Sequence, residues 1–318
     1  MGNSGKGCGK ARSDGGEALH PASPPRPGLR AYLAIMRPHQ WSKNLLVFLP
    51  LFASHESSPA LWLDGVWAFV CFSLVASSVY VLNDMLDLDA DQDHPRKRHR
   101  SFASGAVPLS HGTMIAPALL LAGVAVGLLV WRMEFLLVVA LYYVTTLAYS
   151  LGLKRKPILD ICVLAVLYTL RIYAGGAATG LAISQWLLAF SVFFFFSLAA
   201  VKRLGELADG VRSGRETVAG RGYENDDYLM VAIMAVASGY VAVLVMAFYL
   251  DSPTVGLLYN HPGFLWGLCP VLLFWISRMA LTAYRGRMDD DPIVFAVKDR
   301  VSRYCAMLVL LVIIAGTV

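Results

Sequence analysis

The stretch VLNDMLDLDADQDHPRKRHRSF, residues 81–102, places five aspartates and four arginine or lysine residues directly behind an apolar run at 62–84. An apolar run of that length is typical of a helix that crosses a bilayer, which needs about 20 such residues. The whole chain has 318 residues, of which 57% are hydrophobic and 15% charged, whereas soluble domains carry about 25% charged residues. The composition therefore predicts an all-α, polytopic membrane protein.

Nine apolar segments are candidates for membrane-spanning helices. The expected spans are 42–55, 62–84, 113–131, 135–152, 160–180, 185–201, 229–250, 263–282 and 302–317. Lysine and arginine gather in 1–43, 96–100, 154–156, 202–221 and 285–303, and the alternate loops hold almost none. Because basic loops stay on the cytoplasmic side, this alternation predicts about nine transmembrane helices in the cell membrane, with the N-terminus cytoplasmic and the C-terminus outside.

The net charge, the first 30 residues and the cysteines narrow the class of protein further. The net charge of +5 is mostly this orientation signal, together with whatever the cytoplasmic loops bind, and it does not indicate a nucleic-acid partner. Residues 1–30 are rich in Gly, Ser and Pro, which predicts a disordered cytoplasmic tail before a transmembrane domain at 31–318. The five cysteines are scattered without a CxxC pair, which favours packing residues over a disulfide or zinc framework.

The aspartates of 81–102 divide into two sets on a helix with 100° between residues. The set on one face is Asn83, Asp84, Asp87 and Asp91, and the two on the opposite side are Asp89 and Asp93. Facing carboxylates repel one another unless a positive charge lies between them. Mg²⁺ takes oxygen ligands and usually binds through one or two carboxylates plus substrate phosphates. We therefore predict a metal and phosphate site on that face, with a solvated helix end as the alternative.

A second charged stretch is YSLGLKRKPILDICVLAVLYTLRIYAGG, residues 149–176. Helical spacing puts Tyr168, Arg171 and Gly175 on the same face as Asp160, with the arginine about 16 Å deeper than the aspartate. An arginine at that depth is costly against lipid, so we expect it to face a polar cavity. The alternative is an internal ion pair that only holds helices together. The glycines at the end of this stretch permit close helix packing.

The end of the sixth span adds a third group of charges. Lys202 and Glu206 are four residues apart, and Arg203 lies beside the lysine. Such residues form either an ion pair on a solvated helix end or a third wall of a pocket that binds phosphates. The acidic and basic groups are all expected at the cytoplasmic side, around one polar cavity.

These residues resemble the UbiA-type intramembrane prenyltransferase superfamily, because NDMLDLDAD at 83–91 matches its NDxxDxxxD signature. Within it, the sequence is most similar to the decaprenyl-phosphate phosphoribosyltransferase branch. The stretches that carry this similarity are RPHQWSKNLLVFLPLFA (37–53), NDMLDLDADQDHPRKRHRSFASGAVP (83–108), YSLGLKRKPILDICVLAVLYTLRIYAGGAA (149–178), KRLGEL (202–207) and DPIVFAVKDR (291–300). The resemblance covers nearly the whole chain from residue 31, and it implies a nine-helix bundle with a lateral opening for a polyprenyl chain.

The resemblance also implies a reaction and a site. The reaction is the Mg²⁺-dependent transfer of a 5-phosphoribosyl group from phosphoribosyl diphosphate to a polyprenyl phosphate, which releases diphosphate and makes a lipid-linked sugar precursor for the cell envelope. The lipid bilayer and both substrates are then partners, and a homo-oligomer stays open. The implied metal-binding residues are Asn83, Asp84, Asp87 and Asp91, the three aspartates being catalytic. The implied substrate-binding residues are Asn83, Lys43, Lys97, Tyr149, Lys154, Asp160, Tyr168, Arg171, Lys202, Arg203 and Glu206.

The sequence departs from this family at two places. The branch usually continues the first motif as Arg-Pro, whereas here Ser101 follows Arg100. Prenylating members carry a second aspartate-rich motif near the fifth span, where this chain has KRKPILD, with three bases and only Asp160. Bases at that position suit a donor with an additional phosphate, which carboxylates would repel.

Two other functions stay open. One is an enzyme that moves a polyprenyl group from its diphosphate to an aromatic acceptor, as in quinone or haem synthesis. The other is a transporter or lipid carrier, which the sequence disfavours because transporters usually show paired repeats and broken helices.

Overall fold

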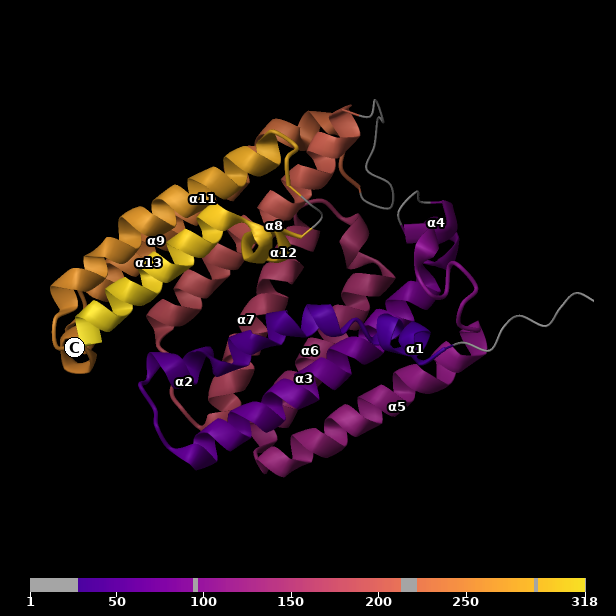
Figure 1. Cartoon of the computed structure of the whole chain (residues 1–318), viewed down its shortest axis with the longest axis horizontal. Helices are drawn as coiled ribbons and strands as arrows, with labels where there is room; N and C mark the ends of the chain where they lie inside the picture. Colours follow the sequence, from indigo (N-terminus) through magenta and orange to yellow (C-terminus); the bar gives the residue numbers. More distant parts are fainter. Residues whose placement is uncertain (1–27, 94–96, 213–221, 289–290, 318) are drawn as a thin grey trace, which may run out of the picture.

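The computed structural model describes residues 28–93, 97–212, 222–288 and 291–317, and every regular element in these ranges is a helix, with no strand. Figure 1 shows the long helices lying side by side as a bundle, with connecting loops at its two ends. The predicted all-α, polytopic class is therefore confirmed. The expected tail at 1–30 lies outside the described residues up to position 27, and helix α1 (Leu29–Met36) begins just beyond them.

Eight helices in the described ranges are long and apolar enough to cross a membrane. They are α3 (Pro59–Leu86), α5 (Leu109–Gly127) with the 3₁₀ turn η3 (Leu128–Val130), α6 (Met133–Leu151), α7 (Leu159–Thr179), α8 (Gln185–Arg212), α9 (Tyr228–Leu250) after η5 (Asn225–Asp227), α11 (Leu268–Tyr284) after η6 (Pro262–Gly267), and α13 (Arg300–Thr317). Each coincides with an expected span. Helix α8 continues well past the expected end at 201, because the charged residues that follow remain helical.

The ninth expected segment, 42–55, is helical but differs from the others. Its residues 42–53 lie in the 3₁₀ helix η1 (Pro38–Phe48) and the short helix α2 (Leu49–Ala53), of 11 and 5 residues, and its last two residues form a turn. A 3₁₀ helix rises about 2.0 Å per residue and an α-helix about 1.5 Å. The two together measure about 30 Å, which equals the hydrocarbon thickness of a bilayer. A ninth crossing is therefore compatible with the length of this segment, although its residues are few.

The helices pack around two apolar cores. Helix α3 contacts α5, α6 and α7, and this side is filled by buried residues such as Phe72, Phe135 and Tyr142. Helix α8 contacts α7, α9 and α11 around a second core that includes Leu204 and Met279. Because α7 contacts both α3 and α8, this helix lies between the two halves of the bundle (Figure 1).

The close packing expected at the end of the fifth span is confirmed at Gly175. A β-carbon there would lie only 1.9 Å from the carbonyl oxygen of Val47, so the backbone of η1 rests directly on α7. This contact brings the polar residues of η1 against those of α7, including Arg171.

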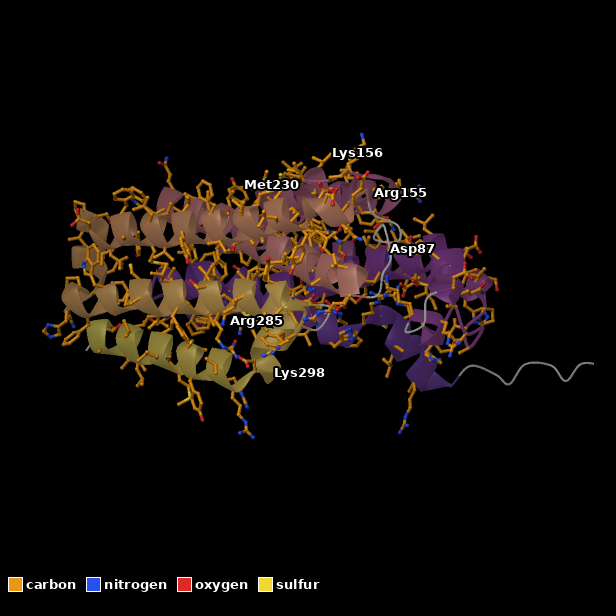
Figure 2. The ribbon with its side chains drawn as sticks, turned by 90° about the horizontal axis from the view of Figure 1, so that it is seen from above. Asp87, Arg155, Lys156, Met230, Arg285 and Lys298 are labelled. Carbon is orange, nitrogen blue, oxygen red and sulfur yellow. The ribbon has the colours of Figure 1, made fainter. Side chains whose placement is uncertain are left out.

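Short elements gather where the charged loops lie. They are α4 (Leu88–Asp93), η2 (Lys97–His99), η4 (Leu153–Arg155) and α12 (Pro292–Lys298), and α10 (Pro253–Leu258) lies elsewhere between α9 and η6. In Figure 2 the labelled side chains of Asp87, Arg155 and Lys156 lie toward the same end of the molecule. The acidic motif and the basic stretch after α6 therefore meet, as the sequence predicts.

Candidate functional site

The acidic motif spans a break between two helices. Helix α3 ends before Asp87, whose backbone (φ −94°, ψ 13°) is not helical, and α4 begins at the next residue. Asp84 and Asp91 are buried, whereas Asp89 and Asp93 are exposed. This burial agrees with the two sets that helical spacing predicts.

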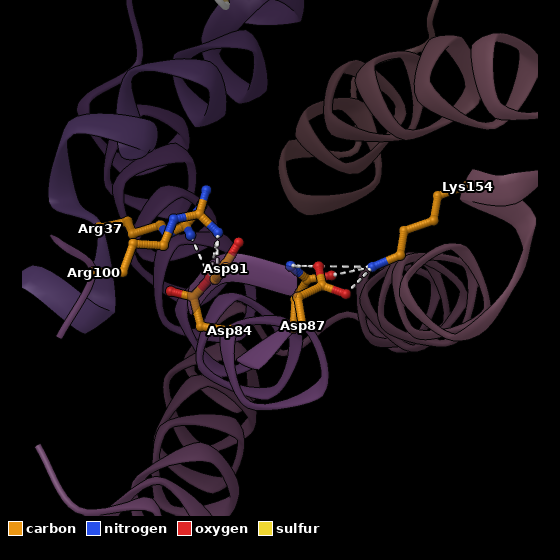
Figure 3. A network of polar contacts seen from close by, with 7 residues as sticks. Arg37, Asp84, Asp87, Asp91, Arg100 and Lys154 are labelled. Carbon is orange, nitrogen blue, oxygen red and sulfur yellow. Dashed lines mark hydrogen bonds and ion pairs between the residues drawn. The ribbon is translucent and has the colours of Figure 1, made fainter. Parts of the chain in front are cut away.

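Two buried carboxylates of the motif meet two arginines (Figure 3). The Nη1 atom of Arg100 donates to Asp91 at 2.6 Å and to Asp84 at 3.3 Å. Arg37 donates to the same oxygen of Asp84, and its guanidinium lies 5.5 Å from the ring centre of Tyr80. The two carboxylates thus converge on one positively charged nitrogen, which is how closely spaced carboxylates avoid mutual repulsion.

The third carboxylate, Asp87, lies at the break itself and meets a lysine. Lys154 donates to both carboxylate oxygens of Asp87, at 2.6 and 2.8 Å, and to the amide oxygen of Asn83 at 3.2 Å. Asn83 in turn donates to Asp87 at 3.0 Å. The four expected metal ligands therefore form two pairs, Asp84 with Asp91 and Asn83 with Asp87. The carboxylate of Asp87 points to Lys154 and away from the other two (Figure 3). Across the described residues, no group of three or more His, Cys, Asp or Glu side chains is arranged to hold a metal.

Asp160 and Arg203 form a fully buried ion pair between α7 and α8. The Nε atom of Arg203 donates to Asp160 at 2.9 Å, and the same guanidinium contacts Glu206. The hydroxyl of Tyr223 donates to Asp160 at 2.6 Å and accepts from the amide of Ile158 at 2.7 Å. Burial and the hydrogen bond to Asp160 both raise the pKa of Tyr223. These groups satisfy one another inside the protein, which is the behaviour of a structural ion pair.

Arg171 is buried among neutral groups. It donates to Asn44 at 2.9 Å, to the Tyr142 hydroxyl at 2.8 Å and to the carbonyl of Leu167 at 2.6 Å. Its guanidinium also lies 4.8 Å from the ring centre of Tyr142 and 5.4 Å from that of Tyr168. Since no carboxylate in the described part of the chain pairs with it, the alternative of an internal ion pair does not apply there. A desolvated cation of this kind favours a nearby anion.

Lys43 on η1 pairs with Asp291, which precedes α12. The ammonium of Lys43 also lies 5.9 Å from the ring centre of Tyr168. Asp291 accepts a hydrogen bond from the amide of Ile293 at 2.9 Å and so caps α12. Burial raises the pKa of Asp291, but the positive charges of Lys43 and Lys202 and the two hydrogen bonds lower it more, so that it lies below its ordinary value.

The other expected site residues are less central. Lys97 is exposed on η2, and Tyr149 is half-buried against the core of α3, α6 and α7. The expected cytoplasm-facing cavity stays a prediction. The groove between α11 and α13 is lined by apolar residues such as Phe274 and Leu308 and lies away from the charged network.

The site also contains residues that the sequence analysis did not select. They are Arg37, Asn44, Arg100, Tyr142 and Asp291. The first two lie in RPHQWSKN, beside Lys43, so that stretch already carried a signal. Tyr142 is a polar residue in an apolar span, and only the fold shows which of several such tyrosines meets the arginine.

The long apolar helices and the buried network of carboxylates, lysines and arginines define a membrane protein with several crossings and a charged site between its helices. The chain belongs to the UbiA prenyltransferase family, whose model matches residues 44–298.

Relatives of known sequence support this membership. The protein y4nM of Sinorhizobium fredii is 37% identical over 88% of this chain, and the chain spans only 55% of that relative's length. The nodulation protein NoeC of Azorhizobium caulinodans is 35% identical over 87% of this chain and 90% of its own length. The decaprenyl-phosphate phosphoribosyltransferase of Mycolicibacterium smegmatis is 32% identical over 90% of this chain and 92% of its own length.

Solved structures share the fold. A UbiA homologue from Archaeoglobus fulgidus, bound to GPP and Mg²⁺, matches with a TM-score of 0.64 at 14% identity, over 89% of this chain and 99% of that one. A digeranylgeranylglyceryl phosphate synthase matches with a TM-score of 0.62 at 18% identity, over 91% of this chain and 98% of that one.

Proposed function

We propose that this protein transfers a 5-phosphoribosyl group from phosphoribosyl diphosphate to a polyprenyl phosphate and releases diphosphate. The observation that carries the proposal is the contact between Lys154 and Asp87. The prenylating members of the family have acidic residues near the Lys154 stretch, but here a base reaches the acidic motif itself. A basic wall suits a donor that carries a further phosphate. The phosphoribosyltransferase of M. smegmatis, similar along 90% of this chain, supports the same reaction.

The carboxylates of Asp84 and Asp91 fit a divalent cation, since both already contact a single cationic nitrogen of Arg100. Mg²⁺ usually binds through one or two carboxylates plus substrate phosphates, and when bound it would neutralise charge on the departing diphosphate. Arg37 and Arg100 would then exchange the carboxylates for phosphate oxygens, which guanidinium groups bind through paired hydrogen bonds. Asp87 would keep Lys154 in position beside them.

The chain's own residues account for the remaining steps. The bond between the ribosyl carbon and the diphosphate breaks, and a phosphate oxygen of the acceptor forms the new bond to that carbon. No general base is required, because the acceptor phosphate is already an anion. Fixed positive groups such as Arg37, Lys154 and Arg171 would stabilise negative charge in surroundings that contain little water, where such interactions are strong.

A transfer assay tests the proposal. The purified full chain is incubated with Mg²⁺, decaprenyl phosphate and phosphoribosyl diphosphate labelled in the ribose. We expect a labelled lipid and one diphosphate released for each lipid formed, with both lost in excess EDTA. Activity on a prenyl diphosphate and an aromatic acid, without labelled lipid at any acceptor length, would instead assign the aromatic prenyltransferase function.

A further inference from the structure

The ion pair between Lys43 and Asp291 joins distant parts of the chain at a buried position. The side chains of Lys43 and Asp291 are only 11% and 13% exposed. Burying two charges costs free energy that their attraction often fails to offset. The bundle also has separate contacts between η1 and α7, including the close approach at Gly175, so the pair is not the sole contact of η1.

The cluster around this pair carries more positive than negative charge. Lys202 on α8 is close enough to contribute to the lowered pKa of Asp291. Within the described ranges, no carboxylate lies at ion-pair distance from the Lys202 ammonium. The guanidinium of Arg171 lies 5.4 Å from the ring centre of the same Tyr168 and has no acidic partner among the described residues. Among the described residues, one carboxylate therefore lies near two ammonium groups, and this balance of charge suits an anion with two negative charges.

We propose that Lys43 and Lys202 form a subsite for a phosphate monoester, and that Asp291 fills this subsite as an internal counterion until a substrate phosphate replaces it. A phosphate monoester carries about −1.5 to −2 charges at pH 7, whereas a carboxylate carries one. The inference rests on the proposed function for its ligand. Two phosphate monoesters take part in that reaction, the 5-phosphate of the donor and the phosphate of the lipid acceptor.

The substitution Asp291→Asn isolates the charge. Asparagine caps helices as well as aspartate does, so the cap on α12 is retained while the competing negative charge is lost. Binding of ribose 5-phosphate and of farnesyl phosphate is measured by titration calorimetry on the purified full chain in detergent. An opposite charge within about 4–6 Å changes an ionic equilibrium by one or more tenfold steps. We therefore expect at least one probe to bind about tenfold tighter.

The two probes identify the source of the phosphate. Tighter binding of ribose 5-phosphate alone assigns the subsite to the donor, and tighter binding of farnesyl phosphate alone assigns it to the acceptor. Lys43→Gln removes one side of the subsite, so the same probe should bind about tenfold more weakly. The double variant Lys43→Gln with Asp291→Asn should bind that probe more weakly than Asp291→Asn alone.

Asp299→Asn is the matched control. Asp299 ends α12, pairs with Arg278 at 2.7 Å and accepts from the amide of Ser302 at 2.8 Å, so its change also removes a paired charge beside the same helix. Its loss should leave both affinities unchanged. An equal gain in this control, or unchanged or weaker binding by a folded Asp291→Asn, overturns the proposal.

Asp291→Ser serves if the asparagine variant does not fold, because serine also caps helices. Turnover is not needed for these titrations. A protein that makes no phosphoribosyl lipid but shows the Asp291 effect would refute the reaction and keep the subsite. A protein that makes the lipid but does not show the Asp291 effect would keep the reaction and refute the subsite.

Discussion

At the scale of single residues, the acidic motif shows what helical spacing can and cannot predict. Spacing separates Asp84 and Asp91 from the exposed Asp89 and Asp93, because each of the four lies within a regular helix, α3 or α4. It does not predict that Asp87 turns to Lys154, since the helix breaks at that residue. Asp160 was expected in the pocket. The sequence does not show that this side of α7 meets Arg203 on α8, because that contact depends on the fold.

Asp84→Asn is expected to lower the turnover number at least about 100-fold, the loss typical of removing one electrostatic contact from a transition state. The amide keeps the shape of the side chain but removes the charge that faces Arg37 and Arg100. Asp89→Asn is the control, since Asp89 lies two residues before Asp91 but is exposed. This variant should keep full activity in the transfer assay. Full activity of a folded Asp84→Asn would refute the metal assignment.

At the scale of helices, apolar length predicted eight elements well, because a bilayer demands long uninterrupted runs. The bounds of the helical segment at 38–53 were predicted less precisely, as 42–55. Its 3₁₀ geometry covers more distance per residue, and residue counts assume α-helical rise. The glycines of α7 were easier to interpret, since a small residue in a spanning helix usually marks a close neighbour.

Gly175→Ala is expected to lower the free energy of unfolding by about 1–3 kcal/mol, the usual cost of overpacking. The added carbon would press into the Val47 carbonyl, 1.9 Å away, and would push η1 from α7. Gly205→Ala on α8 is matched in chemistry, but its new carbon would have no neighbour within 4 Å. That control should raise stability by about 0.5–1 kcal/mol through helix propensity. Thermal unfolding in detergent measures both, and equal effects would contradict the packing argument.

At the scale of the whole molecule, the number of crossings decides where the chain ends. Eight crossings put both termini on one side of the membrane, whereas nine put them on opposite sides. The alternation of basic loops favours nine, with the charged network at the cytoplasmic face. Spans and loop charges come from the sequence, but the contacts within the network depend on side chains from α3, α7, α8 and η1 meeting in space.

Cysteine labelling tests this orientation in a cysteine-free background. Ser57 is exposed between α2 and α3, and Ser104 is exposed between η2 and α5. In intact cells, Ser57→Cys should react with a membrane-impermeant maleimide, because 38–53 would carry it to the outer face, whereas Ser104→Cys should react only after lysis. Because α3 crosses between these two positions, labelling of Ser104→Cys in intact cells with protection of Ser57→Cys until lysis would contradict this orientation.

The buried pair of Asp160 and Arg203 has a consequence for the residue beside it. Arg203 is fully buried and paired with Asp160 in the contact between α7 and α8, so this pair ties one face of α8 to α7. Lys202 is the preceding residue and lies about 100° away around α8. Its positive charge contributes to the lowered pKa of Asp291. Exchanging these two neighbours would leave composition, net charge and the charge of the loop unchanged. The order of these two basic residues thus decides which of them meets Asp160 and which lies toward Asp291. Neither composition nor net charge shows this order.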